Sequence, residues 1–308
     1  MDTLVFDRSF SGEYGKVEWL SPRLRRVTAT NPGPFTFTGT NTYIVGTGSV
    51  AIIDPGPDDG AHLDALLNAL RGEIVTHIFV THTHKDHSPL ARKLKDITGA
   101  DIYAEGPHRA MRIWNEEAFA PLEASNDLTF APDHQLQDGE TISRQGWTLE
   151  AIATPGHTAN HMCFALVEDQ ALISGDHIMA WSTSIIAPPD GAMQPYMQSL
   201  HKIAARDWQT IWPGHGGPIR DPAKTIAATL AHRHAREAQI LAALKDGPLA
   251  IFPIVEKIYT HLEKNMHGAA ALSVFAHLED LATRGIVTAQ PDISLNAVYT
   301  SNQRSFSF

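Results

Sequence analysis

Hydrophobic and polar positions follow two alternating periods along the N-terminal third of the chain. Short apolar runs rich in β-branched residues, bounded by glycine, proline or aspartate, predict strands within 41–56, 74–80 and 101–106. Between them, leucine and isoleucine recur at helical spacing over 58–72 and 90–99, and a glycine ends each segment. This order, with strands and helices in turn, predicts a layered α/β fold.

Residues 127–175 have a different pattern, in which short apolar runs follow one another without helical spacing. These runs predict further strands. Asp138-Gly139 lies between two of them, and because this dipeptide favours a tight left-handed turn, it predicts a hairpin there. Apolar residues return at helical spacing over 194–206, which predicts another helix.

A long helical pattern then carries Pro222 near its start and Gly247 after its end, as expected at helix termini. Two shorter helical patterns and a small strand-rich end follow it. We therefore expect two domains, a larger one over residues 1–220 and a smaller, mainly helical one over residues 221–308.

Candidate chemistry begins with the segment "VTHTHKDHSPL", which directly follows a buried strand. His82 and His84 are two positions apart, so in an extended segment they face the same way. Asp86 and His87 follow as the chain turns into a helix. Ligands bind at such strand ends in open α/β sheets. Imidazole with carboxylate suits zinc, and manganese or iron are the alternatives.

Four such side chains in six residues would crowd one tetrahedral ion, which suggests two ions and therefore further ligands elsewhere in the chain. His157, Asp176 and His215 each follow a short apolar run and lie beside a glycine that permits a tight loop. Seven candidate ligands at four predicted strand ends are enough for two ions. The sequence therefore predicts a site for two zinc ions per chain, or for two Mn²⁺ or Fe²⁺ ions.

The series His82-x-His84-x-Asp86-His87, followed by His157, Asp176 and His215, resembles the metallo-β-lactamase superfamily in order and spacing across residues 40–220. The resemblance implies an αββα sandwich that binds two metals. It implies that His82, His84 and His157 bind the first ion, that Asp86, His87 and His215 bind the second, and that Asp176 bridges them. It also implies that Asp54, in "IIDPG", supports the ligand loop.

By the same resemblance we expect a hydrolase in which two close dications activate a bridging hydroxide that attacks a carbonyl or phosphoryl centre. Asp176 and Asp86 are the expected catalytic residues, and Asp86 would carry a proton to the leaving group. Neither Ser182 nor Ser184 has an assigned base. His161 and His177 flank ligands, and the sequence leaves open whether they are structural or face the substrate.

The region after Gly247 resembles the winged-helix-like tail of the lactamase-β-like protein 2 group, some members of which cleave single-stranded RNA. Two enzymatic alternatives follow: hydrolysis of a small-molecule ester, thioester or lactone, and cleavage of single-stranded RNA or another phosphodiester. A third alternative is a DNA-binding module with a vestigial metal site. The tail contains few basic residues, so we expect it to wall the active site or to form a homodimer contact, without gripping duplex DNA.

Composition adds limits to these expectations. The 308 residues carry a formal net charge of -10, which disfavours nucleic-acid partners in general and leans towards small molecules. Cys163 is the single cysteine, so no disulfide forms within the chain, and we expect it to be a buried apolar side chain. No secretory signal and no long uninterrupted apolar run is present, so we expect a cytoplasmic protein without a membrane partner.

Overall fold

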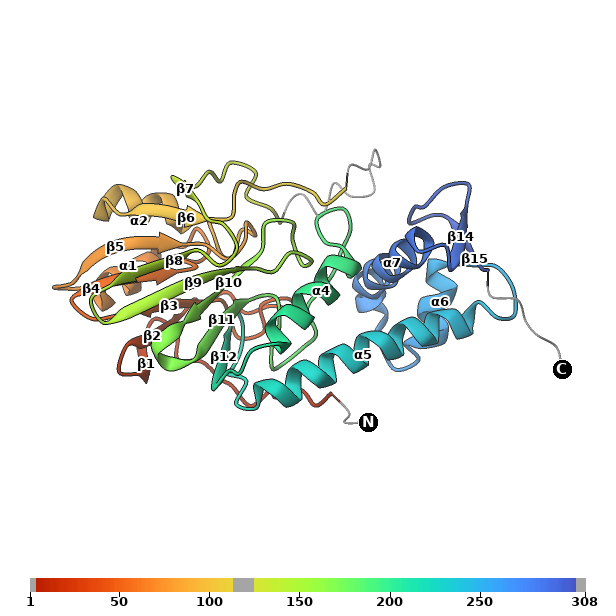
Figure 1. Cartoon of the computed structure of the whole chain (residues 1–308), viewed down its shortest axis with the longest axis horizontal. Helices are drawn as coiled ribbons and strands as arrows, with labels where there is room; N and C mark the ends of the chain where they lie inside the picture. Colours follow the sequence, from red (N-terminus) through yellow and green to blue (C-terminus); the bar gives the residue numbers. More distant parts are fainter. Residues whose placement is uncertain (1–3, 113–124, 303–308) are drawn as a thin grey trace.

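Two β-sheets face each other in the computed structural model, which describes residues 4–112 and 125–302 (Figure 1). The first sheet has seven strands in chain order: β1 (Val17–Ser21), β2 (Leu24–Thr28), β3 (Asn41–Val45), β4 (Ser49–Ile53), β5 (Ile74–Phe79), β6 (Asp101–Ala104) and β7 (His134–Gln135). The second has the order β12-β11-β10-β9-β8, made of β8 (Thr141–Arg144), β9 (Trp147–Ala153), β10 (Met162–Leu166), β11 (Ala171–Gly175) and β12 (Thr210–Pro213).

Alternation along the central strands explains the layers. On β4, Ala51 and Ile53 point into the core between the sheets, whereas Val50 and Ile52 point to the opposite face. Helices α1 (Gly60–Ala69) and α2 (Leu90–Thr98) cover that outer face, and α4 (Met193–Ala204) covers the outer face of the second sheet. The helix–sheet–sheet–helix order confirms the predicted αββα sandwich.

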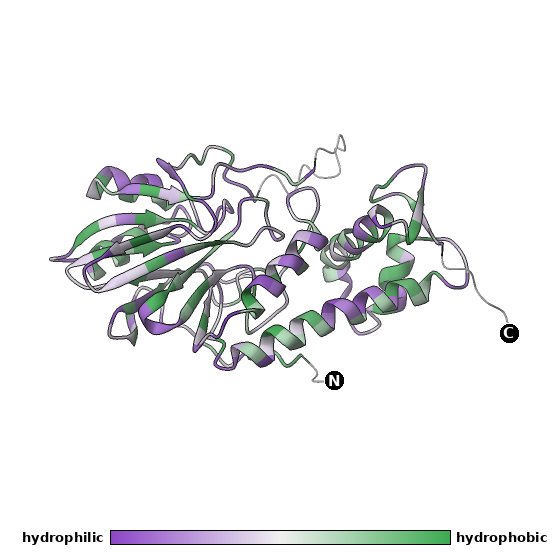
Figure 2. Cartoon of the chain, viewed as in Figure 1, coloured by the Kyte–Doolittle hydropathy of each residue, from purple (hydrophilic) through white to green (hydrophobic). Residues whose placement is uncertain are grey.

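The C-terminal region forms a second core. It consists of α5 (Pro222–Ala243), α6 (Ile251–Ile258), η3 (Lys264–Met266), α7 (His267–Thr283) and a three-stranded sheet of β13 (Leu249–Ala250), β15 (Val298–Ser301) and β14 (Val287–Gln290). Helix α5 runs from the sandwich to this region (Figure 1) and alternates between hydrophobic and hydrophilic patches (Figure 2). The C-terminal end of α5 packs with α6 and α7 in one apolar cluster, and the members of this cluster on α7 include Val274, Phe275 and Leu278. This arrangement matches the predicted winged-helix-like tail, whose boundary at residue 220 stays a prediction.

One local prediction was wrong. Asp138-Gly139 does not close a hairpin, because the strands on either side, β7 and β8, belong to different sheets. Instead the turn carries the chain across the sandwich. The carboxylate of Asp138 accepts a hydrogen bond from the backbone N–H of Ala153, and Gly139 has a φ of 79°. The two residues therefore do form a turn, but it connects strands of different sheets. The hairpin lies one turn later, between β8 and β9 at Gly146.

The long helix α5 follows its predicted terminal signals. The Asp221 side chain accepts a hydrogen bond from the backbone N–H of Lys224, and Pro222 occupies the first turn. In the described parts of the chain, neither this helix nor any other is both long enough and apolar enough to cross a membrane. A cytoplasmic location stays a prediction.

Candidate metal centre

All seven predicted ligands lie in loops at strand ends and converge on one place. His82 and His84 follow β5, and Asp86 and His87 occupy the turn before α2. The other three follow β9, β11 and β12, and are His157, Asp176 and His215. Their ligand atoms form two groups, in each of which all the atoms lie within 4.8 Å of one another. The structure therefore brings the whole predicted set together, and its role in metal binding stays a prediction.

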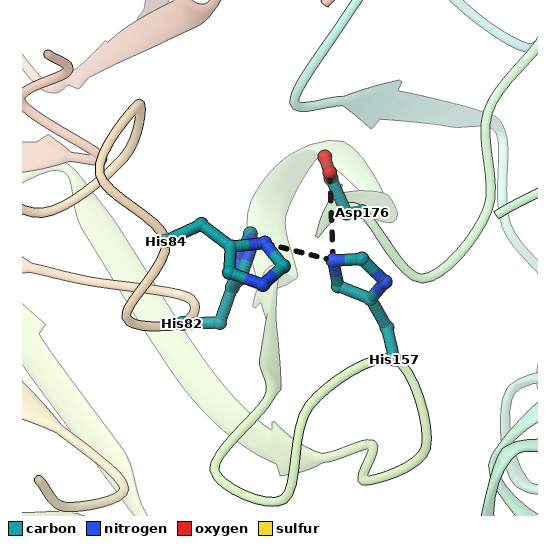
Figure 3. A group of neighbouring side chains, drawn as sticks. All are labelled: His82, His84, His157 and Asp176. Atoms are coloured by element: carbon teal, nitrogen blue, oxygen red, sulfur yellow. Dashed lines mark hydrogen bonds and ion pairs between the residues drawn. The ribbon is translucent and has the colours of Figure 1, made fainter. Parts of the chain in front are cut away.

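The first group contains three imidazoles and a carboxylate (Figure 3). Nε2 of His82 lies 2.9 Å from Nδ1 of His84, and Nε2 of His157 lies 3.1 Å from the same atom. Oδ2 of Asp176 is 3.7 Å from Nε2 of His157. Nitrogen ligands of a tetrahedral zinc ion lie roughly 3.3 Å apart, so this spacing is suitable for one ion.

The second group is richer in carboxylate. Nε2 of His87 and Nε2 of His215 are 3.2 Å apart, and Oδ2 of Asp86 lies 3.3 Å and 3.1 Å from them, respectively. Oδ1 of Asp176 also approaches both nitrogens, at 3.5 Å from His87 and 3.3 Å from His215. The two oxygens of Asp176 thus face different groups, as expected of a side chain between two ions.

Asp54 organises the loop that carries the first four ligands. One of its oxygens accepts the backbone N–H of Thr81 at 2.7 Å; the other accepts the Thr81 hydroxyl at 2.7 Å and Nδ1–H of His87 at 2.9 Å. The Thr81 oxygen in turn lies 3.0 Å from Nδ1 of His82. Asp54 has a φ of 52°, an unusual conformation for a residue with a side chain, so the backbone accepts strain to aim this carboxylate.

Backbone carbonyls orient two further ligands. Nδ1 of His157 lies 2.6 Å from the carbonyl oxygen of Ile185, and Nδ1 of His215 lies 3.3 Å from that of Gly39. Each Nδ1 can therefore donate its proton outward to a carbonyl. In the neutral imidazole that a metal requires, this leaves the Nε2 lone pair pointing inward, so these residues fit a cation.

The two groups differ in their electrostatics. In the first, burial and then the neighbouring imidazoles hold the pKa of His82 well below its usual value, and that of His84 falls to about 3. In the second, burial alone would lower the pKa of His215, but Asp176 and Asp86 outweigh it and raise the pKa to about 9. His82 and His84 therefore present neutral nitrogen donors, and the second group compensates positive charge with carboxylates.

The two groups open into a cavity of about 540 Å³. Its walls are mainly apolar and include Phe35, Met179, Ile185, Ala187, Ala269 and Leu272. Ala269 and Leu272 belong to α7, so the tail forms one wall of the cavity, which confirms the first of the two roles expected for it.

Three polar residues around the site have positions that the sequence could not reveal. Nε2 of His161 accepts the backbone N–H of Asp176 at 3.2 Å, so this histidine is structural and aims the carboxylate between the groups. His177 is fully buried against the ring of Tyr196 and is structural too. Asp190 lines the cavity and is held by Asn126 at 2.6 Å. His161 and His177 lie close to His157 and Asp176 in the sequence, but only the fold shows what they contact, and no spacing signal points to Asp190.

Cys163 is buried, as expected, and burial raises the pKa of its thiol to about 12. A thiol with so high a pKa is not a nucleophile.

An αββα sandwich with a convergent histidine–aspartate cluster defines a class of metal-site hydrolases. This chain belongs to the Metallo-beta-lactamase superfamily, which matches residues 35–215, and residues 253–294 match the Beta-lactamase associated winged helix domain. Both parts of the family resemblance seen in the sequence are thereby confirmed.

Two relatives and one solved structure extend this result. A beta-lactamase-like protein 2 homolog from Caenorhabditis elegans is 31% identical over 276 residues, which cover 88% of each chain. An atrochrysone carboxyl ACP thioesterase from Aspergillus aculeatus is 35% identical over 248 residues, 79% of this chain and 72% of the relative. A metallo-beta-lactamase family protein from Thermus thermophilus has a TM-score of 0.72 and 26% identity, and covers 92% of this chain and 100% of its own.

Proposed function

We propose that this hydrolase contains a dinuclear zinc site and acts on small-molecule thioesters, with esters and lactones as chemically related substrates. The observation that carries this proposal is the cavity: its walls are mainly apolar and its floor is the ligand cluster. Such a cavity suits an acyl group bound beside a reactive carbonyl. A relative named as an ACP thioesterase supports the thioester class.

His82, His84 and His157 would hold one ion, and Asp86, His87 and His215 the other, with Asp176 between them. Two bound dications would lower the pKa of a water molecule between them and polarise the substrate carbonyl. Buried partners hold the ligands in register, so that they need little reorganisation during the reaction. Asp54 and His161 are positioning residues in this scheme, because they act through His87 and Asp176, respectively.

Proton movement would fall to Asp86. Its side chain is 26% exposed, against 10% for Asp176, and it lines the cavity. It can therefore exchange a proton between the cavity and the leaving group. A thiol leaving group has an ordinary pKa near 8.5, so it departs as a thiolate with little help, whereas an alkoxide from an ester needs protonation more.

Cleavage of single-stranded RNA is the alternative. Besides its histidines, the cavity wall carries three aspartates, Asp86, Asp176 and Asp190, and one lysine, Lys85. This balance disfavours a polyanionic backbone except where phosphate would contact the ions directly. We also propose that the protein binds no duplex DNA, and a homodimer stays a prediction.

A substrate screen tests the proposal. Protein loaded separately with zinc, manganese or iron is assayed with matched thioester, ester and lactone substrates, bis-p-nitrophenyl phosphate and single-stranded RNA. The thioester should react fastest, and a chelator should abolish turnover. Elemental analysis should find about two ions per chain, while exposed His201→Ala on α4 serves as a control that retains them. Turnover of RNA without turnover of any acyl substrate would establish the alternative.

A further inference from the structure

A second cavity of about 170 Å³ adjoins the first. Four residues line both cavities, namely Phe35, Met179, Ile185 and Ala269. The shared residues place the two spaces side by side, and the ligand cluster lines the larger one. A thioester has two branches on its carbonyl carbon, and two adjoining compartments, one of which holds the reactive centre, offer each branch its own space.

The two compartments differ in chemistry. The larger is mainly apolar beside the ligand cluster, whereas the smaller has hydroxyl groups from Ser182, Thr183, Tyr259 and Ser273 among apolar walls. A wall that combines hydroxyl-bearing and apolar residues suits a chain that carries both amide groups and methylenes. An apolar acyl group fits the larger compartment better.

The backbone from Trp181 to Ile185 connects the smaller compartment to the ligand cluster. Trp181 lines the smaller compartment, and the carbonyl of Ile185 accepts Nδ1–H of His157 at 2.6 Å. Between them, the carbonyl of Ser184 accepts a hydrogen bond from the buried guanidinium of Arg233 on α5. Hydrogen bonds therefore hold this segment at Ser184 and at Ile185, and it forms a wall along which a flexible chain could lie.

A positive charge lies behind the aromatic wall of the smaller compartment. The guanidinium of Arg236 stacks 4.0 Å from the ring centroid of Tyr259, and its Nε is buried without a hydrogen-bond partner. Within residues 4–112 and 125–302, no carboxylate lies within ion-pair distance of Arg236. Arg236 lines neither cavity, so this charge is separated from a bound chain by the Tyr259 ring and is not a direct contact.

We propose that the smaller compartment binds the amide-bearing thiol arm of a pantetheine-type thioester, while the acyl group occupies the larger one. The inference rests on the proposed thioester hydrolysis, and it names the leaving-group side of the substrate. In the reaction, the oxygen of water bonds to the carbonyl carbon and the carbon–sulfur bond breaks. The thiol, with one proton from that water, leaves along the smaller compartment.

Neighbouring residues on α7 provide a matched pair of variants. Ser273 lines the smaller compartment and Leu272 the larger. Substrates are a benzoyl thioester of pantetheine and S-methyl thiobenzoate, which share the acyl group and differ in the arm. Ser273→Phe should lower the ratio of kcat/KM for the long substrate to that for the short one by about 10-fold. Leu272→Phe should lower both values and leave the ratio unchanged, and Ser273→Ala should change the ratio little. Melting curves establish that each variant is folded.

Binding gives a readout independent of turnover. Calorimetry with S-methyl-pantetheine should show Kd raised about 10-fold by Ser273→Phe. An unchanged Kd in folded Ser273→Phe overturns the arm site, even if thioesters are hydrolysed. Binding that follows these expectations without any thioester turnover would sustain the arm site and refute only the proposed function.

Discussion

The ligand loops of the sandwich and the C-terminal helices both form walls of the cavity, but different kinds of interaction hold them in place. The ligand loops present polar side chains held by buried partners, such as Asp54 under His87 and His161 behind Asp176. The tail presents Ala269 and Leu272, whose helix is held by an apolar core. Chemistry therefore depends on single polar atoms, whereas the fit of a substrate depends on the size of side chains.

The largest effect should come from the shared carboxylate. Asp176→Ala removes the oxygens that face both ligand groups. We expect turnover to fall by more than about 100-fold, beyond the range typical of residues that only orient ligands. Metal content should fall as well, while circular dichroism stays near that of the unaltered protein. Full activity in this variant would refute the assignment of Asp176.

A smaller loss should follow from Asp54→Asn, which keeps the shape of the side chain but replaces one acceptor oxygen with a donor. If the amide nitrogen replaces Oδ2, both Nδ1–H of His87 and the Thr81 hydroxyl lose their acceptor; if it replaces Oδ1, the backbone N–H of Thr81 does. We expect metal affinity or activity to fall about 10–100-fold. A titration with zinc in competition with a chromophoric chelator measures this. Asp54 lies behind the ligand loop and contacts no substrate in this scheme. A change in KM without loss of metal affinity or kcat would therefore contradict the role given to the ligand loops.

A substitution in the tail should alter which acyl groups are preferred, without affecting metal binding or the hydrolytic step. Leu272→Ala widens the cavity wall without approaching the ligand atoms. We expect up to about 10-fold changes in kcat/KM that depend on the size of the acyl group, since a few methylenes in an apolar pocket discriminate to that extent. Metal content should stay the same. Equal loss for every acyl chain length, together with loss of metal, would show that the tail supports the chemistry directly.

The smallest effect concerns DNA. Between residues 247 and 290 the basic residues are Lys257, Lys264 and Arg284, and Arg284 is already paired with Glu237 and Asp280. Neutralisation of phosphates supplies most non-specific affinity, so we expect very weak duplex binding near physiological salt. Fluorescence anisotropy at two salt concentrations is sufficient. Tight, salt-sensitive binding that depends on the tail would reverse the roles assigned to the two regions.

The ligand set could be predicted from the sequence because each ligand lies at a strand end, marked by apolar runs and tight turns. The layers could be predicted for the same reason, since period and turn residues are local. The family resemblance indicated one partner of the ligands, Asp54. It did not indicate the carbonyl of Ile185 or the role of His161, because these reach His157 and Asp176 only through contacts between separate segments. Asp138-Gly139 was misread for a related reason: a turn signal does not say whether the flanking strands share a sheet.

The contact between Arg233 and the carbonyl of Ser184 has a thermodynamic consequence. It joins α5, which runs into the tail, to a segment whose next carbonyl orients His157. A ligand that shifts this segment and moves His157 with it would change the free energy of metal binding, and metal binding would change the affinity for that ligand by the same factor. Ligand binding in the smaller compartment and metal binding should therefore depend on each other. A titration with either one, in the presence and absence of the other, measures this coupling.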